Sequence, residues 1–163
     1  MTVAIGPATL PDAGALTDIA HQAKAHWGYP DAWIRRWSGE LTIVPAYLTR
    51  AVVNVARIGP KPVAFYALVP LEGRRQDWEL DHLWVSPGVM GRGIGRALLT
   101  HAAQQVTRRG GRSLFILSDP HAEAFYHALG AHSVGRAPAF MDGHERWLVE
   151  MELTIEPHPI AGF

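Results

Sequence analysis

The sequence predicts a mixed α/β (α+β) fold, in which about four helices flank a mostly antiparallel central sheet of about six or seven strands. Helical and extended hydrophobic patterns alternate along the chain, with no linker and no internal repeat. Three successive strand patterns in residues 51–85 are joined by short turn sequences, and short connections suffice for antiparallel pairing. The length of 163 residues fits one domain, so we assign residues 1–163 to a single domain.

Capping and turn residues bound the predicted elements. Thr9 offers a hydroxyl cap, with Pro11 early in the first turn and Asp12 three residues after the cap, which is typical of a helix start. Asp31 caps a second, shorter helix, and Gly110 ends a later one. In order, the predicted elements are strand 3–6, helix 9–26, helix 31–41, strands 51–58, 61–71 and 76–85, a helix that follows a glycine stretch and ends near residue 109, strand 112–118, helix 119–130, and strands 132–137 and 146–155.

The composition limits the classes of partner. The 15 basic and 15 acidic residues cancel, so no global positive field attracts nucleic acid or an anionic membrane. The absence of cysteine excludes disulfides, thiolate metal sites and a cysteine nucleophile, and it suits a reducing compartment. The sequence shows neither a signal peptide nor an apolar run long enough to span a membrane. We therefore expect a cytoplasmic protein with no nucleic-acid and no membrane partner.

Three glycines at alternate positions of the segment MGRGIG (90–95) separate a strand pattern from a helix pattern. A dinucleotide-binding motif needs another glycine at the position of Leu98, and a P-loop needs a Gly-Lys-Ser/Thr triplet, so both fit poorly. Backbone N–H groups at a glycine bend before a helix can form a concave pyrophosphate site, and Arg92 and Arg96 add charge. The alternative is a glycine-rich turn that serves chain geometry alone.

Two segments resemble the GNAT superfamily of acyl-CoA-dependent N-acyltransferases. The first is LWVSP followed by MGRGIG, similar to the family's strand, turn and helix. The second is DPHAEAFYHALGA, similar to a later family helix that begins with Asn and carries Ala and Phe-Tyr before a terminal Gly. The resemblance is good from about Gln76 to Gly130. Three positions depart from the family pattern, with Met90 for Gln or Arg, Asp119 for Asn and Ala131 for Phe.

The resemblance implies a GNAT-like sheet that splays between its fourth and fifth strands, with acetyl-CoA bound in the gap as cosubstrate. The pantetheine arm would pair with the backbone of Leu83–Val85 as an added strand, and the pyrophosphate would lie on the N–H groups of Gly91–Arg96. The cofactor-binding residues that it implies are Leu83, Trp84, Val85, Met90, Gly91, Arg92, Gly93, Ile94, Gly95, Arg96, Asp119, Ala122 and Phe125.

The implied reaction is direct transfer of an acetyl group to a primary amine in a ternary complex, because a chain without cysteine cannot form a cysteine-linked acyl-enzyme. Tyr126 is the candidate acid for the leaving thiolate, with a packed helix tyrosine as the alternative interpretation. Glu79 and Asp81 share one face of a strand and are candidate bases, with an ordinary charged edge or a salt-bridged pair as the alternative. His82, on the other face, is a further candidate for the base.

The segment HWGYPDAWIRRW suits the acceptor site, because the first two helices usually flank the acceptor in the family that the sequence resembles. Aromatic walls suit an apolar or cationic substrate, although core packing is expected to account for at least two of the four aromatic residues here. The candidate substrate-binding residues are Trp27, Tyr29, Trp33 and Phe140, with Trp37, Met141 and His144 as further candidates.

The predicted acceptor is an amine of a small molecule or a protein. No metal site is expected, because neither a His-Glu-x-x-His motif nor a histidine pair spaced for one helical face occurs. A catalytically inactive acyl-CoA-binding sensor or interaction module is the alternative function, and a homodimer is left open.

Overall fold

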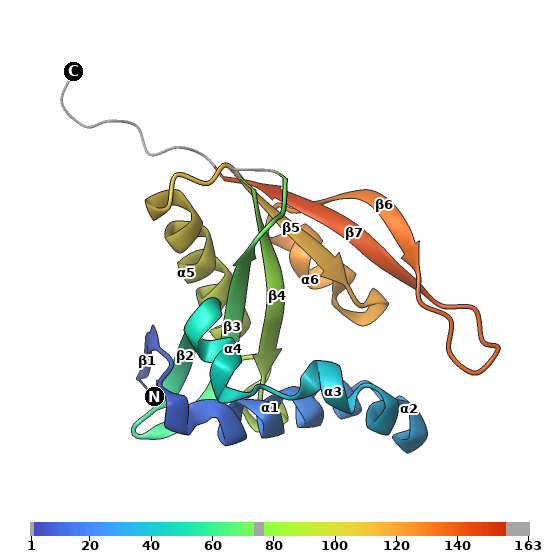
Figure 1. The fold of residues 1–163 in the computed structure, drawn as a ribbon, viewed down its shortest axis with the longest axis horizontal. Helices are drawn as coiled ribbons and strands as arrows, with labels where there is room; N and C mark the ends of the chain where they lie inside the picture. The colour runs from blue at the N-terminus through green and yellow to red at the C-terminus, as the bar shows by residue number, and fades with distance from the viewer. Residues whose placement is uncertain (1, 74–76, 156–163) are drawn as a thin grey trace. The chain divides into compact units, whose positions relative to one another are not determined.

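A computed structural model describes residues 2–73 and 77–155 of the chain, and within these ranges it contains seven strands and six α-helices (Figure 1). The strands are β1 (Val3–Pro7), β2 (Val52–Ile58), β3 (Lys61–Pro70), β4 (Asp77–Val85), β5 (Ser113–Ser118), β6 (His132–Pro138) and β7 (Trp147–Thr154). The α-helices are α1 (Ala13–His26), α2 (Asp31–Arg36), α3 (Ser38–Leu41), α4 (Pro45–Arg50), α5 (Ile94–Arg108) and α6 (Glu123–Ala128). Three short 3₁₀ turns are η1 (Leu10–Asp12), η2 (Pro87–Val89) and η3 (Pro120–Ala122).

The strands form a sheet in the order β1-β2-β3-β4-β5-β7-β6. The pairs β1–β2, β2–β3, β5–β7 and β6–β7 are antiparallel, and β4 pairs with β5 in parallel. This mixed, mostly antiparallel sheet confirms the predicted fold class. The parallel pairing runs from Asp77↔Ser113 to Glu79↔Phe115. Such a short pairing is consistent with a splay between the fourth and fifth strands, and the splay itself stays a prediction.

The chain is organised in two compact units. We call Met1–Val69 with Asp81–Leu99 the N-terminal unit, and Pro70–Leu80 with Thr100–Phe163 the C-terminal unit. Both β4 and α5 therefore contribute residues to each unit.

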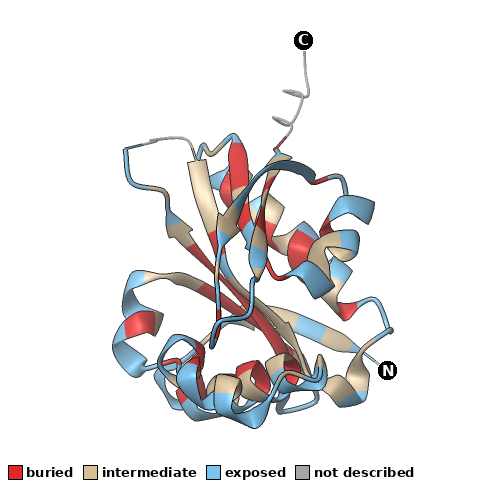
Figure 2. Cartoon of the chain, turned by 90° about the vertical axis from the view of Figure 1, so that its right-hand side faces the viewer, coloured by how far each residue is buried: buried red, intermediate tan, exposed pale blue. Residues whose placement is uncertain are grey.

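The core of the N-terminal unit is formed by one face of α1 and by the central strands (Figure 2). The buried residues of α1 include Leu16, Ile19, Ala20 and Ala23, at the spacing of a single helical face. In β3, the residues from Val63 to Leu68 are buried without alternation, as expected for a strand that is covered on both sides. The helix start predicted at Thr9 is a 3₁₀ turn, in which the Thr9 N–H donates to the Asp12 carboxylate over 2.8 Å.

The core of the C-terminal unit is formed by β5, β7 and the second half of α5. Leu114 and Ile116 of β5 are buried, as are Val149 and Met151 of β7. Gly111 follows α5 where the chain passes very close to its neighbours, because a Cβ there would lie 2.5 Å from Cγ1 of Val106. Only glycine fits this turn without displacing the core.

The structure differs from the sequence prediction in two helices. The helix predicted over 31–41 is interrupted at Trp37, whose ψ of 0° separates α2 from α3, and its cap position is Pro30 rather than Asp31. Helix α4 was not predicted, although Pro45 at its first position is a common helix start. Residues Arg74–Gln76, assigned to a turn and a strand start, lie outside the described residues, as does the C-terminal segment 156–163.

No helix among the described residues is long and apolar enough to span a membrane.

Candidate active site

A glycine loop joins β4 to α5 within the N-terminal unit. After η2, Gly91 and Gly93 have φ angles of 77° and 81°, a region that side-chain-bearing residues rarely adopt. Backbone turns of this kind can direct successive N–H groups towards one concave side, where an anion can bind. The two glycines therefore set the backbone course of this loop.

The first turn of α5 adds further donors beside this loop. The Ala97 N–H donates to the Gly93 carbonyl over 3.1 Å, so the N–H groups of Ile94–Arg96 precede the intrahelical ladder. Ile94, the first residue of α5, is buried and anchors this helix start in the core.

A pyrophosphate fits this loop. A Cβ built at Gly91 or at Gly93 would meet no atom within 4 Å, so the space beside both glycines is open. Donors from the loop and from a helix start suit an anion, and the exposed Arg92 and Arg96 add positive charge.

The end of β4 carries Leu83–Val85, the segment predicted to pair with pantetheine. All three residues are half-buried. The Trp84 indole N–H donates to Nδ1 of His82 over 3.0 Å, which confirms that these two side chains share one face of the strand. Trp84 also lies 5.8 Å from the ring of Trp27, so the predicted cofactor strand and the predicted acceptor segment meet within this unit.

Asp81 is the exposed candidate base on β4. The Tyr47 hydroxyl, from α4, donates to Oδ2 of Asp81 over 2.5 Å. The carboxylate is 38% exposed, so it combines a fixed orientation with access to solvent. The other candidate, Glu79, is half-buried on the part of β4 that belongs to the C-terminal unit.

His82 is held as a neutral imidazole. Burial lowers the pKa of His82, and the charge of Asp81 opposes this shift only in part. An indole N–H can only donate, so Nδ1 of His82 accepts and the ring proton resides on Nε2. His82 thus has no free lone pair with which to accept a proton while the Trp84 bond is intact.

An aromatic cluster follows α1 in the same unit. Tyr29 lies 5.0 Å from Trp37 and 6.0 Å from Trp33, and Trp33 lies 6.0 Å from Trp37. Trp37 is buried, whereas Trp27, Tyr29 and Trp33 are half-buried. Trp37 is therefore the most deeply packed ring of the cluster, and the other three rings are partly exposed.

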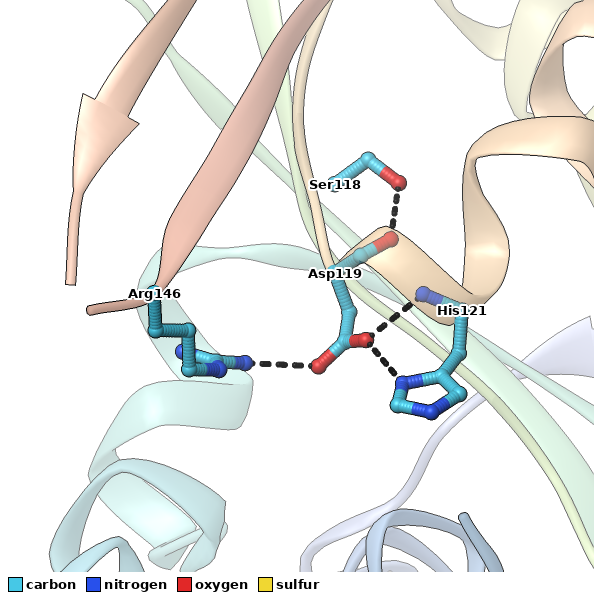
Figure 3. Close-up of polar contacts among 4 residues, drawn as sticks. All are labelled: Ser118, Asp119, His121 and Arg146. Carbon is cyan, nitrogen blue, oxygen red and sulfur yellow. Dashed lines mark hydrogen bonds and ion pairs between the residues drawn. The ribbon is translucent and has the colours of Figure 1, made fainter. Parts of the chain in front are cut away.

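In the C-terminal unit, Asp119 follows β5 and holds together a polar cluster with His121 and Arg146 (Figure 3). Its Oδ1 accepts from the backbone N–H of His121 over 2.9 Å and lies 2.9 Å from Nδ1 of the same residue. Its Oδ2 accepts from Nη2 of Arg146 over 2.7 Å, and both side chains are at most 10% exposed. Asp119 thus caps the turn that precedes α6, and its carboxylate also forms an ion pair that the sequence did not reveal.

Tyr126 and Phe125 lie on α6 in the same unit. Tyr126 is buried, and its ring meets that of Phe125 edge to face at 5.1 Å. Burial raises the pKa of the Tyr126 phenol, so the group stays protonated at neutral pH. Ala122 ends the 3₁₀ turn before α6.

The loop between β6 and β7 carries the remaining acceptor candidates. Phe140 is 57% exposed and packs edge to face on Trp147 at 5.7 Å. Met141 is buried, and it bridges His144 through paired backbone hydrogen bonds of 3.1 and 2.8 Å.

Residues 15–131 match the model of the acetyltransferase (GNAT) family. The chain belongs to the GNAT family. No curated protein matches the chain significantly in sequence. The family match covers β2 to β5, the glycine loop and α6, so it includes both segments on which the predicted resemblance rested.

Solved GNAT structures share the fold at low sequence identity. The PaiA N-acetyltransferase of Thermoplasma acidophilum, in complex with coenzyme A, is 17% identical with a TM-score of 0.75, over 94% of this chain and 99% of its own. The ribosomal-protein-S18-alanine N-acetyltransferase of Escherichia coli is 18% identical with a TM-score of 0.72, over 99% of both chains. YncA of Salmonella typhimurium, with acetyl-CoA, is 20% identical with a TM-score of 0.70. The match with YncA covers 99% of this chain and 99% of the YncA chain. At these identities the likeness establishes the fold alone.

Sequence reasoning missed three residues of this GNAT chain. Tyr47 lies on the unpredicted helix α4, Arg146 carries no motif, and Lys24 looks like an ordinary helix-end lysine. Pro45, at the first position of α4, was the sequence signal that could have pointed to the helix that carries Tyr47. Arg146 depends on a contact between distant segments, and Lys24 depends on the chain reversal after α1 that brings Tyr29 and Trp37 to it.

Proposed function

We propose that the chain transfers an acetyl group from acetyl-CoA to a primary amine by direct attack in a ternary complex. The observation that carries this proposal is the glycine loop, whose N–H groups and open glycine positions suit a pyrophosphate beside the half-buried end of β4. Membership in an acetyltransferase family supports the same reaction class.

When bound, acetyl-CoA supplies the thioester that the amine attacks. Residues Gly91–Arg96 hold the anionic end through backbone donors, and the backbone of Leu83–Val85 orients the extended arm as an added strand would. These contacts need few particular side chains, so Met90 in place of the family's Gln or Arg does not prevent binding.

Asp81 is the proposed base. Its carboxylate is exposed, oriented by Tyr47 and able to accept the proton that the amine loses, directly or through a water molecule. His82 is the weaker candidate, because Nδ1 already accepts from Trp84. Turnover of Asp81→Asn and Glu79→Gln distinguishes the two carboxylates, since only the base should lose most of its rate on substitution.

Tyr126 is the proposed acid. Its buried phenol retains its proton at neutral pH and can donate it to the leaving sulfur. The Phe125 ring packs against it and limits the rotamers of the phenol.

CoA release in the presence of a panel of primary amines tests the proposed function. A thiol-reactive dye reports CoA without background, because the protein has no cysteine. Mass spectrometry of the amine should then show one acetyl group for each CoA released. Acetyl-CoA binding, measured by calorimetry, distinguishes an active transferase from the alternative function of an inactive acyl-CoA-binding module. Stoichiometric binding with no release for any amine would support the inactive acyl-CoA-binding module, and absence of binding would contradict both.

A further inference from the structure

The ammonium group of Lys24 is enclosed by three aromatic rings. Its Nζ lies 4.4 Å from the ring centroid of Trp37, 5.2 Å from that of Tyr29 and 5.6 Å from that of Trp27. All three distances are within the range in which a cation is attracted to the face of an aromatic ring. We call Trp27, Tyr29 and Trp37 the aromatic cage.

The local sequence builds this cage from a helix end and a chain reversal. Lys24 lies in the last turn of α1, and Trp27 follows three residues later on the same side of the helix. Gly28, with φ of 83°, turns the chain, so that Tyr29 and the end of α2 come back towards Lys24. Trp33 also contacts two of these rings, at 6.0 Å from Tyr29 and 6.0 Å from Trp37.

A lysine side chain is a weak occupant of such a cage. Its ammonium is a strongly hydrated point charge on a flexible stem, and it loses rotamer freedom when it is held in place. A larger and less hydrated cation gains more from the same rings, which is why aromatic cages suit quaternary ammonium ligands. A ligand with additional contacts can therefore replace the Lys24 ammonium.

The cage is next to the strand to which the proposed function assigns the acetyl donor. Trp27 belongs to the cage and lies 5.8 Å from Trp84, in the middle of Leu83–Val85. A molecule whose cationic end occupies the cage would thus place a second group near the end of β4. An acceptor with a reactive amine a few bonds from a cation matches this arrangement.

We propose that Trp27, Tyr29 and Trp37 form a binding site for a cationic group of the amine acceptor, and that Lys24 occupies this site until the acceptor replaces it. The inference rests on the proposed function for the identity of the ligand as an acceptor. The substrate class is a primary amine with a second cationic group, as in diamines, polyamines or amines with a quaternary ammonium.

Choline binding tests the cage without any acetyl transfer. We expect choline to bind Lys24→Met about tenfold more tightly than the wild type, because the internal competitor is gone. Its neutral isostere 3,3-dimethylbutanol should bind neither protein measurably. Equilibrium binding by NMR and by tryptophan fluorescence gives both affinities. Lys61→Met, which removes an exposed lysine at the start of β3, is the matched control and should behave as the wild type.

Removing a ring from the cage should abolish choline binding. Trp37→Leu in the Lys24→Met background is the direct variant, and Tyr29→Leu, at a half-buried position, serves if loss of the buried Trp37 unfolds the protein. Choline binding that survives both substitutions, or that is absent from Lys24→Met, would overturn the proposal.

Acceptor preference is the second test. The kcat/KM for 4-(trimethylammonio)butylamine should exceed that for its neutral isostere 5,5-dimethylhexylamine, and Tyr29→Leu should bring the ratio towards one. A preference for carboxylated amines that is lost in Lys24→Met would mean that Lys24 binds an anion, which contradicts the proposal. Choline binding without any transferase activity would leave the cage standing and reject the proposed function. Acetyl transfer without choline binding would support the proposed function and reject the aromatic cage.

Discussion

The phenol of Tyr126 is surrounded by protein on α6, where burial raises its pKa and the ring of Phe125 fixes one side. Tyr126→Phe keeps the packed ring and deletes the proton donor. We expect turnover to fall by about 10²–10⁴-fold while acetyl-CoA affinity changes little. A dissociation constant and a single-turnover rate measured on one preparation test this, and full activity of the variant would reject Tyr126 as the acid.

Asp119 and Arg146 form a buried ion pair between the end of β5 and the residue before β7. Arg146→Met leaves the Asp119 carboxylate buried without its guanidinium partner. We expect this change to lower the free energy of unfolding by about 3 kcal/mol, the low end of the cost of breaking a buried pair. Urea denaturation measures it.

A double-mutant cycle of Asp119→Asn and Arg146→Met tests whether the charge of Asp119 causes this loss of stability. In the Asp119→Asn background, which keeps a capping acceptor without the charge, Arg146→Met should cost much less. Arg136→Met, at an exposed position of β6, is the matched control and should have little effect on stability. Equal costs in both backgrounds would contradict an electrostatic role.

The sequence alone could single out Tyr126 as a candidate, but it gave no signal for Arg146. Tyr126 lies in a segment with several family-like positions, whereas Arg146 is isolated in the sequence. Its partner is fixed by the antiparallel register of β5 with β7, which pairs Ser118 with Val149 and brings the two strand ends together. Register between distant strands is not encoded in local patterns.

At the level of elements, the glycine loop before α5 combines two requirements in one position. Gly93 needs glycine for its φ of 81°, and the proposed function also needs the open space where a Cβ would lie. Gly110, at the end of α5, has φ of 74° and equally open surroundings. Gly93 and Gly110 therefore share the same backbone constraint, but only Gly93 lies in the proposed phosphate site.

Gly93→Ala and Gly110→Ala form a matched pair on this basis. Each should lower the free energy of unfolding by about 1–2 kcal/mol, the cost of a left-handed conformation for a residue with a Cβ. Only Gly93→Ala should also weaken acetyl-CoA binding, which calorimetry measures. Unchanged affinity in Gly93→Ala would remove the phosphate site from the proposed function.

Most strands and the long helices could be predicted, because their hydrophobic periodicity or turn residues are distinct. The short helices were harder. Helix α4 has only Tyr47 buried, so it shows no amphipathic repeat. The break at Trp37 also has no signal in the sequence. Trp37 still donates its N–H to the Trp33 carbonyl over 3.0 Å, and a helical sequence pattern continues through it.

At the scale of the whole molecule, two histidines make stability depend on pH. Burial lowers the pKa of His82, and burial together with the charge of Arg108 lowers that of His101. The unfolded chain therefore binds more protons than the folded one below the ordinary histidine pKa, so stability rises with pH in this range. We expect the free energy of unfolding to decrease as the pH falls from about 7 to about 5.

His82→Gln should reduce this pH dependence, because one of the two imidazoles with a lowered pKa is removed. Urea denaturation at several pH values gives the slope for both proteins. Protonation of Nδ1 in the folded protein also breaks the bond from Trp84, so tryptophan fluorescence should change in the wild type only, at a pH below the ordinary histidine pKa. An unchanged slope in the variant would show that His82 does not titrate on unfolding.

The order of strands in the sheet could be predicted only in part. Short turns predicted the β2–β3 hairpin, and the helix between β4 and β5 is the crossover that a parallel pair requires. The insertion of β7 between β5 and β6 has no local signal, because it depends on which edge the last strand finds.

That insertion leaves β6 at the edge of the sheet, where open backbone groups could recruit a strand from another molecule and start aggregation. The strand contains several features that oppose this. Val134 lies at a break in register with β7, and such a bulge twists the edge away from regular pairing. Pro138 removes a donor, and the exposed Arg136 adds a charge. The exposed edge strand β6 is thus irregular, whereas a regular edge strand would favour pairing with a second copy of the protein.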